Sequence, residues 1–219
     1  MQREPETELM EDKAQVEAYA RADFSLPHQQ FIDMLSTLVE PAEFDGIALE
    51  LGCGPGDISR RFVKAYPFSR LYALDGSKPM LDYANALIDD SNRLRLTFIH
   101  GKLPDTRLPL SRYDLIFSNS LLHHLPEPGV LWQFIKRYAQ PGARVAVMDL
   151  LRPETRQEAK DKVACYANDE PEILQRDFYQ SLLAAFTLEE IHRQLHQACL
   201  DFTVTQSSDR HVFITGRIP

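Results

Sequence analysis

The middle of the chain alternates between two patterns of apolar residues. Short apolar runs have the length and composition of buried strands, and they occupy residues 46–51, 70–75, 94–100, 113–118 and 144–150. Apolar residues at helical spacing lie between these runs, at residues 57–66, 79–87 and 130–138. Apolar strands that alternate with helices indicate a parallel sheet covered by helices on both faces.

The N-terminal part has helical periodicity without strands. Residues 8–22 predict one helix, and a second carries Phe31, Leu35 and Leu38 on one face. We expect a break around residues 25–27 between the two helices. Residues 1–40 are therefore predicted to form a helical flap.

The C-terminal part predicts one helix and then a hairpin. Thr187 and Glu190 have the spacing of a capping box, which starts a helix. Apolar and polar residues then alternate around Phe202 and Val212, on either side of a turn at residues 207–209. We expect a single α/β domain over residues 1–219, with a doubly wound, Rossmann-like sheet. Its seven strands would be mostly parallel and end in an antiparallel hairpin.

Residues 152–186 interrupt the strand–helix rhythm. They predict one or two helices directly after the strand at 144–150. Ligands of open α/β sheets bind at the carboxyl ends of the strands. An insertion at this point is therefore expected to be a lid over the site, although it could also be packing without ligand contact.

The segment Glu50-Leu51-Gly52-Cys53-Gly54-Pro55-Gly56 ends the first predicted strand and opens a helix. Glycine lets the backbone take positive φ and lie against a ligand, and the next helix offers free N–H groups. A nicotinamide dinucleotide site would need G-x-G-x-x-G, but its third glycine position holds Asp57. An aspartate beside a pyrophosphate is electrostatically unfavourable.

The pattern G-x-G-x-G after Glu50 resembles the first motif of class I S-adenosylmethionine-dependent methyltransferases. Three further segments resemble that family in the right order, and coverage extends over roughly residues 15–217. They are residues 71–81 (LYALDGSKPML), 113–125 (YDLIFSNSLLHHL) and the turn at 141–143 (PGA) before a strand. The segment 113–125, with its His-His pair, is similar to small-molecule members of the family, including those of quinone biosynthesis.

The resemblance implies that S-adenosylmethionine is the cofactor and that Asp75 binds its ribose hydroxyls. An acidic rim of Glu50 and Asp57 would suit its ammonium and sulfonium groups better than a pyrophosphate. The expected cofactor-binding residues are Tyr19, Glu50, Gly52, Cys53, Gly54, Gly56, Asp75, Gly76, Met80, Gly101, Lys102, Leu103, Asn119, Ser120 and His124.

Two parts of the expected cofactor site depart from the family pattern or stay open. Many relatives have an acid where Lys102 stands, to bind the adenine amine, and a lysine cannot accept a hydrogen bond. Either Asp105 substitutes, or backbone and apolar contacts hold the adenine. Tyr19 and Asp23 resemble a segment that closes over the methionine end, although Tyr19 could equally be a core residue.

Methyl transfer from a sulfonium needs alignment more than acid–base chemistry, so no conspicuous catalytic cluster is expected. His123 and Asp149 are the candidate catalytic residues, with His123 as a possible base because imidazole titrates near neutrality. A structural role for the His-His pair is the stronger alternative. Cys53 is expected to be a small residue under the cofactor, and Trp132 a packing residue on a partly exposed helix side.

Three side chains near or within the expected lid are candidates for binding the substrate. Arg152 could clamp a carboxylate, or else pair with Asp149 or Glu154. Tyr166 and Tyr179 combine an aromatic ring with a polar hydroxyl, which suits a small and partly apolar acceptor.

Charge and cysteine content narrow the partners. The chain has 24 basic and 32 acidic residues, for a net charge of −8, which disfavours nucleic acid because phosphate binding needs clustered Lys and Arg. Its three cysteines are widely spaced, and we expect neither disulfides nor a metal site. No secretory signal or membrane span is visible, so a cytoplasmic location is expected.

The sequence thus predicts S-adenosylmethionine-dependent methyl transfer to a small molecule by direct displacement. Two alternatives remain at this point. One is a regulatory protein that binds the cofactor without turnover, and the less favoured one is a nicotinamide-dependent oxidoreductase. The sequence leaves the acceptor and the oligomeric state open.

Overall fold

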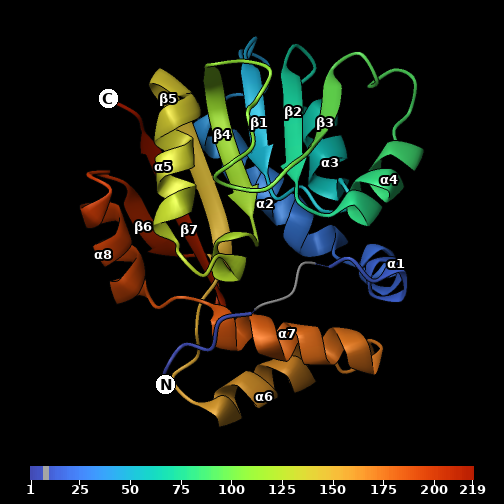
Figure 1. Ribbon diagram of the computed structural model, residues 1–219, viewed down its shortest axis with the longest axis vertical. Coiled ribbons are helices and arrows are strands. Elements are labelled where there is room, and N and C mark those ends of the chain that lie inside the picture. The colour runs from blue at the N-terminus through green and yellow to red at the C-terminus, as the bar shows by residue number, and fades with distance from the viewer. Residues whose placement is uncertain (7–9) are drawn as a thin grey trace.

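A seven-stranded sheet forms the centre of the computed structural model, which describes residues 1–6 and 10–219 (Figure 1). Its strand order is β3-β2-β1-β4-β5-β7-β6. The first five strands are parallel, whereas β7 runs antiparallel to both β5 and β6. The strands are β1 (Ile47–Leu51), β2 (Arg70–Asp75), β3 (Leu96–His100), β4 (Tyr113–Asn119), β5 (Ala139–Leu150), β6 (Thr203–Gln206) and β7 (His211–Arg217). The predicted fold class is confirmed.

Helices cover both faces of the sheet, because successive strand residues point to opposite sides. Leu49 and Ile116 pack with α5 and α8, whereas Ala48 and Leu115 pack with α2 and α3. The helices are α1 (Lys13–Arg21), α2 (Ser25–Leu38), α3 (Asp57–Ala65), α4 (Lys78–Ala86), the short 3-10 helix η1 (Leu122–His124), α5 (Gly129–Tyr138), α6 (Arg156–Tyr166), α7 (Glu172–Ala184) and α8 (Leu188–Gln197).

Several local predictions are correct. The apolar residues that repeat at helical spacing within 57–66 are all buried, and they are Ile58, Phe62, Val63 and Tyr66. Thr187 and Glu190 form the predicted capping box of α8, in which each side chain satisfies a backbone N–H of the other residue. Ser77 caps α4 by accepting a hydrogen bond from the backbone N–H of Met80 at 3.3 Å.

Other local predictions are wrong, and packing explains each of them. Trp132 is fully buried, and its indole N–H donates to Gln194 of α8 at 3.1 Å. Leu87 is exposed and Ile88 takes the buried position after α4. Leu94 is 92% exposed and precedes β3.

Three predicted boundaries also move. The first helix begins at Lys13, and residues 8 and 9 of the predicted range lie outside the described residues. Ser25 begins α2 where a break was predicted. The expected turn at 141–142 lies within β5, with Gly142 at a φ of +82°.

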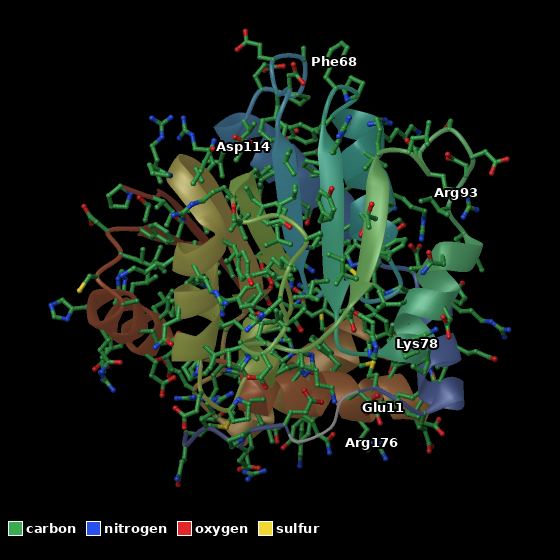
Figure 2. The ribbon with its side chains drawn as sticks, turned by 45° about the horizontal axis from the view of Figure 1, so that its top comes forward. Glu11, Phe68, Lys78, Arg93, Asp114 and Arg176 are labelled. Atoms are coloured by element: carbon green, nitrogen blue, oxygen red, sulfur yellow. The ribbon has the colours of Figure 1, made fainter. Side chains whose placement is uncertain are left out.

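The carboxyl ends of the parallel strands face α6, α7 and the N-terminal segment (Figure 1). In Figure 2, Glu11, Lys78 and Arg176 lie at this end, whereas Phe68 and Asp114 lie at the opposite one. Residues 152–186 fold as the two helices that the sequence predicted. In the described part of the chain, no helix is long and apolar enough to cross a membrane.

Candidate functional site

The glycine loop after β1 has the conformation that its sequence requires. Gly52, Gly54 and Gly56 have φ values of +75°, +50° and +75°, which side chains disfavour. A Cβ on Gly52 would meet Leu121 at 2.9 Å, whereas a Cβ on Gly54 would meet nothing within 4 Å. The loop therefore packs tightly at its base and presents an open backbone surface at Gly54.

Asp75 ends β2 directly beside this loop. Its carboxylate accepts hydrogen bonds from the backbone N–H groups of Gly54 and Ser77, each at 2.7 Å. Burial raises the pKa of Asp75, although the two backbone bonds oppose that shift. Each carboxylate oxygen has a second lone pair, so Asp75 can still accept hydrogen bonds from a ligand's hydroxyl groups.

Glu50 lies one residue before the loop and is almost fully buried. Ser59 of α3 donates a hydrogen bond to its carboxylate, and burial raises the pKa of Glu50 to about 8. Burial also raises the pKa of the neighbouring Cys53 thiol, so Cys53 is not an activated nucleophile. At pH 7 Glu50 is therefore mostly a neutral acid inside the protein.

Asp57, the second residue of the expected acidic rim, has two partners within the protein. The His28 ring lies 2.8 Å from its carboxylate, and Arg61 donates to the same oxygen at 2.7 Å. Burial alone would raise the pKa of Asp57, but these two partners lower it overall. Asp57 is thus a charged residue whose charge is compensated at the start of α3.

The end of β4 presents a polar atom that has no partner. Asn119 Oδ1 is buried and accepts no hydrogen bond within the described residues. Its amide nitrogen donates to Ser120 Oγ at 3.2 Å, and Ser120 has a φ of +57°. Buried polar atoms are almost always satisfied, so an unpaired one points to a missing ligand or water.

The third edge of the expected cofactor site lies after β3. Gly101 N–H donates to the Asp75 carbonyl at 2.9 Å, which ties this loop to β2, and His100 contacts the Gly76 carbonyl at 3.1 Å. Lys102 lies 3.7 Å from Glu11 with both side chains exposed. Asp105 is also exposed.

Two more of the predicted cofactor residues line this region from below and above. Met80 is buried near the start of α4, and Leu103 packs against the core. Burial, and secondly the charge of Asp75, raise the pKa of Tyr19 to about 12. The structure therefore brings most of the predicted cofactor residues to one end of the sheet.

His123 and Asp149 form a buried pair. The ring Nδ1 of His123 lies 2.6 Å from Asp149 Oδ1, and Asp149 Oδ2 accepts from the Leu122 N–H at 2.7 Å. Burial alone would lower the pKa of His123, but Asp149 raises it overall. Asp149 was expected to meet a substrate; it is 2% exposed and instead joins β5 to η1.

The first six residues form a strap against η1 and α7, which the sequence did not predict. Arg3 donates to the carbonyls of His123, Leu125 and Ala184 at 2.9, 2.9 and 2.6 Å. Glu6 lies 3.0 Å from His124 Nδ1. The isolated segment has no periodicity, so only the three-dimensional contacts identify Arg3 and Glu6 as site residues.

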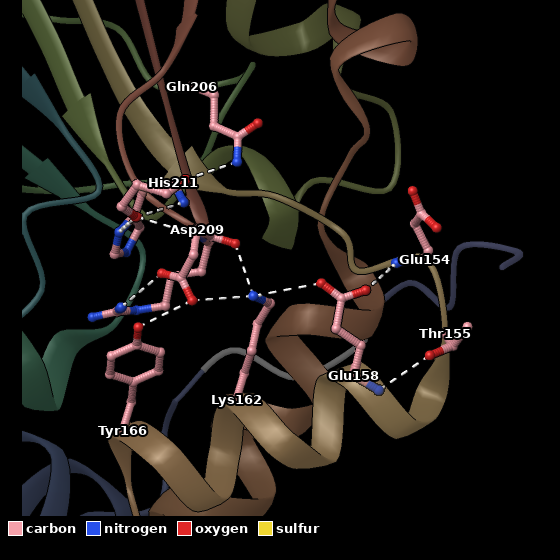
Figure 3. Close-up of polar contacts among 10 residues, drawn as sticks. Glu154, Thr155, Glu158, Lys162, Tyr166, Gln206, Asp209 and His211 are labelled. Carbon is pink, nitrogen blue, oxygen red and sulfur yellow. Dashed lines mark hydrogen bonds and ion pairs between the residues drawn. The ribbon is translucent and has the colours of Figure 1, made fainter.

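The three predicted substrate residues have other partners. Arg152 is 6% exposed and pairs at 2.7 Å with Glu190, rather than with Asp149 or Glu154. The Tyr166 hydroxyl donates to Asp209 at 3.0 Å, and Lys162 contacts the same carboxylate (Figure 3). Tyr179 packs in a small core between α6 and α7. These contacts hold the helices in place, and they leave no argument for assigning the three residues to an acceptor.

Comparison with known proteins agrees with this geometry. Residues 48–143, which contain the glycine loop, Asp75 and the end of β4, match the model of a methyltransferase domain family. This part of the chain therefore resembles a methyltransferase domain. The matched range also covers η1 and the start of β5.

Curated methyltransferases resemble part of the chain. A trans-aconitate 2-methyltransferase from Azoarcus sp. is 29% identical over 49% of this chain and 40% of its own length. A malonyl-[acyl-carrier protein] O-methyltransferase 2 from Ilyobacter polytropus is 27% identical over 56% of this chain and 46% of its own length. The chain thus spans less than half the length of these two relatives.

Solved methyltransferase structures share the fold of this chain over nearly its whole length. A SAM-dependent methyltransferase from Aquifex aeolicus has a TM-score of 0.69 at 18% identity, over 95% of this chain and 99% of that one. The plantazolicin methyltransferase BpumL, solved with SAH, has a TM-score of 0.63 at 15% identity, over 94% and 96%. The seven-stranded sheet with its antiparallel end is therefore a methyltransferase fold.

Proposed function

We propose that this protein binds S-adenosylmethionine at the carboxyl ends of β1, β2 and β4 and transfers its methyl group to a small molecule. One observation carries the proposal: the Asp75 carboxylate is held by the N–H of Gly54, next to the open backbone surface of the glycine loop. A carboxylate in that position is suited to a pair of ribose hydroxyl groups, because it accepts several hydrogen bonds.

The remaining residues fit the same cofactor. The unpaired Asn119 Oδ1 can accept from a ligand's ammonium or amine group. Tyr19 adds an aromatic ring and a hydroxyl near Asp75 from the flap. When bound, S-adenosylmethionine supplies a methyl group on a sulfonium, whose departure as a neutral thioether requires no protein nucleophile.

The protein's own contribution is to position the reactants and exclude water. We assign this role to the flap (residues 1–40) and the lid (residues 152–186). A buried hydrogen bond at 2.7 Å joins Gln15 of α1 to Asp177 of α7, so flap and lid contact each other over the site. A hollow of about 430 Å³ lies where they meet, lined in part by Ala18, Arg21 and Pro171.

The acceptor is proposed to be a small molecule, in keeping with the name of the trans-aconitate 2-methyltransferase relative. We do not assign a carboxylate clamp to Arg152, because Glu190 already neutralises it. His123 is likewise not proposed as a base, because its side chain is almost fully buried. The net charge of −8 makes nucleic acid an unfavourable partner.

Calorimetric titration with S-adenosylmethionine and S-adenosylhomocysteine tests the proposal. We expect micromolar binding to the wild type and at least a roughly tenfold loss in Asp75→Ala, corresponding to about 1.4 kcal/mol. Asp82→Ala is the matched control, since Asp82 is an exposed carboxylate paired with Lys78 on the adjacent helix. Absence of binding at millimolar ligand would overturn the proposal.

The same samples separate the alternatives. Saturable binding of NADH in place of the sulfonium ligand would favour an oxidoreductase, which the compensated Asp57 at the third glycine position disfavours. Cofactor binding without turnover across a broad panel of acceptors would favour a regulatory protein.

A further inference from the structure

Three potential metal ligands converge where the N-terminal strap crosses η1. One ligand atom from each of Glu6, His123 and His124 lies within 4.8 Å of the other two. The two imidazole rings are 4.0 Å apart, tilted by 38°. We propose that these three residues form a binding site for a divalent transition metal ion of the Zn²⁺ type.

The contact between His123 and Asp149 orients the His123 ring for metal binding. Its Nδ1 lies 2.6 Å from the buried Asp149 carboxylate, so Nδ1 carries the proton and the lone pair is on Nε2. Metal-binding histidines almost always donate their other ring N–H to a carboxylate or a carbonyl. Asp149 is itself fixed by the N–H groups of Leu122 and Leu150, at 2.7 and 2.8 Å.

Glu6 is supported in a similar way. Its carboxylate lies 3.0 Å from His124 Nδ1, and Ser181 of α7 donates to it at 3.3 Å. Its side chain is only 11% exposed. The strap that contains Glu6 is held against η1 and α7 by the hydrogen bonds of Arg3. These bonds keep Glu6 close to the two histidines.

The charges around the cluster favour a cation. Glu6 and Asp149 supply two carboxylates, and Arg3 supplies one guanidinium. Arg3 donates to main-chain carbonyls and stacks 3.9 Å above the Phe186 ring, and it makes no ion pair with either carboxylate. The cluster therefore has an excess of negative charge when both imidazoles are neutral.

The ligand set selects the class of metal. Two imidazoles and one carboxylate suit Zn²⁺, Co²⁺, Ni²⁺ or Fe²⁺, whereas Mg²⁺ and Ca²⁺ prefer all-oxygen sites. Bond lengths of about 2.0–2.2 Å require the most distant of the ligand atoms to move closer together when the ion binds. Three protein ligands leave a position open for water. Coordination of an acceptor oxygen or nitrogen there rests on the proposed function, whereas metal binding does not.

Titration of the metal-free full chain with ZnCl₂, followed by calorimetry without S-adenosylmethionine, tests the site. We expect one ion per chain with micromolar or tighter affinity. Glu6→Gln and His124→Gln should each weaken binding by at least about tenfold, as loss of supporting groups alone does in known sites. The control variant His192→Gln/His196→Gln removes an imidazole pair on α8 and should retain the site.

A spectroscopic readout makes the assignment specific to these side chains. Zn²⁺ should shift the imidazole resonances of His123 and His124, and Co²⁺ should give visible d–d bands that Glu6→Gln abolishes. Affinity in the millimolar range, or affinity unchanged in both variants, would overturn the proposal. The cluster would then be two ion pairs that fasten the strap. Because the titration contains no cofactor, its outcome is separate from that of the methyl-transfer proposal.

Discussion

Three carboxylates near the carboxyl ends of parallel strands illustrate how environment sets the role of a residue. Glu50 is buried against one hydroxyl donor and has a pKa of about 8. Asp75 is held by two backbone N–H groups and keeps lone pairs for a ligand. Asp149 is buried against an imidazole, which with its hydrogen bonds lowers its pKa although burial opposes this. Only Asp75 combines charge with access.

The buried His123–Asp149 pair should contribute strongly to stability. His123→Gln would leave Asp149 buried without its counter-charge, and breaking such pairs costs about 3–5 kcal/mol. We expect urea denaturation near pH 6 to show a loss of that size in the free energy of unfolding. A loss below about 1 kcal/mol would contradict the assigned role.

The same pair predicts a pH window. The pKa of His123 is raised from its ordinary value of 6.5, so its contribution is complete below pH 6.5 and is lost as pH rises through the folded pKa. The pKa of Asp149 is lowered from 3.8, so its contribution is present above that pH and is lost as pH falls further. The difference in unfolding free energy between wild type and His123→Gln should therefore be largest between about pH 4 and 6.5 and shrink by pH 9. A difference that grows toward pH 9 would contradict this.

Glu50 also predicts a loss of stability as pH rises. Its pKa is raised from 4.5 to about 8, so stability is lost as pH increases through that interval and the buried carboxyl ionises. The stability of Glu50→Gln relative to the wild type should therefore be higher at pH 8.5 than at pH 5. Thermal denaturation at both pH values checks this, and an equal effect of the substitution at the two would contradict it.

At the scale of elements, local patterns predicted most of the sheet but not the strap. Each parallel strand is a continuous apolar run that can be identified from the sequence. The capping box that begins α8 can be identified in the same way, because Thr187 and Glu190 lie within four residues of each other. Glu6 and His124 come from opposite parts of the chain, and no periodicity connects them. Arg152 was placed correctly at the end of β5, but its partner Glu190 depends on the position of α8. Long-range polar pairs therefore limited the prediction of the site.

The glycine loop offers a matched pair of substitutions. Gly54 and Gly142 have φ values of +50° and +82°, and a Cβ on either would meet nothing within 4 Å. Alanine at either position should cost about 1–2 kcal/mol of stability from backbone strain. Only Gly54→Ala should also weaken S-adenosylhomocysteine binding, because its Cβ would enter the cofactor surface. Calorimetry of both variants decides this, and equal affinities would contradict the loop assignment.

At the scale of the whole molecule, segments distant in sequence converge on one end of the sheet (Figure 1). The strap, α1 and α7 all contact this end, and the β6–β7 turn holds α6 through Asp209, Lys162 and Tyr166 (Figure 3). In the proposed function, flap and lid form a cover over the cofactor site, and the hydrogen bond between Gln15 and Asp177 joins them. A ligand beneath it must be admitted by local opening of these segments.

Hydrogen exchange followed by mass spectrometry tests this arrangement. We expect S-adenosylhomocysteine to slow amide exchange in α1 and α7 as well as in the glycine loop, because a bound ligand suppresses opening of the cover. α5 and α8, on the side of the sheet, should exchange as before. Protection confined to the glycine loop would contradict a covering role for the flap and lid.

The central claim is that the loop between β1 and α3 and the carboxyl end of β2 together hold the cofactor. Mapping backbone amide resonances during titration with S-adenosylhomocysteine tests it most directly. The account predicts saturable shifts centred on Gly52, Gly54, Asp75 and Gly76, with small changes at Asp114 at the opposite end of the sheet (Figure 2). Shifts centred elsewhere, or no shifts at millimolar ligand, would contradict it.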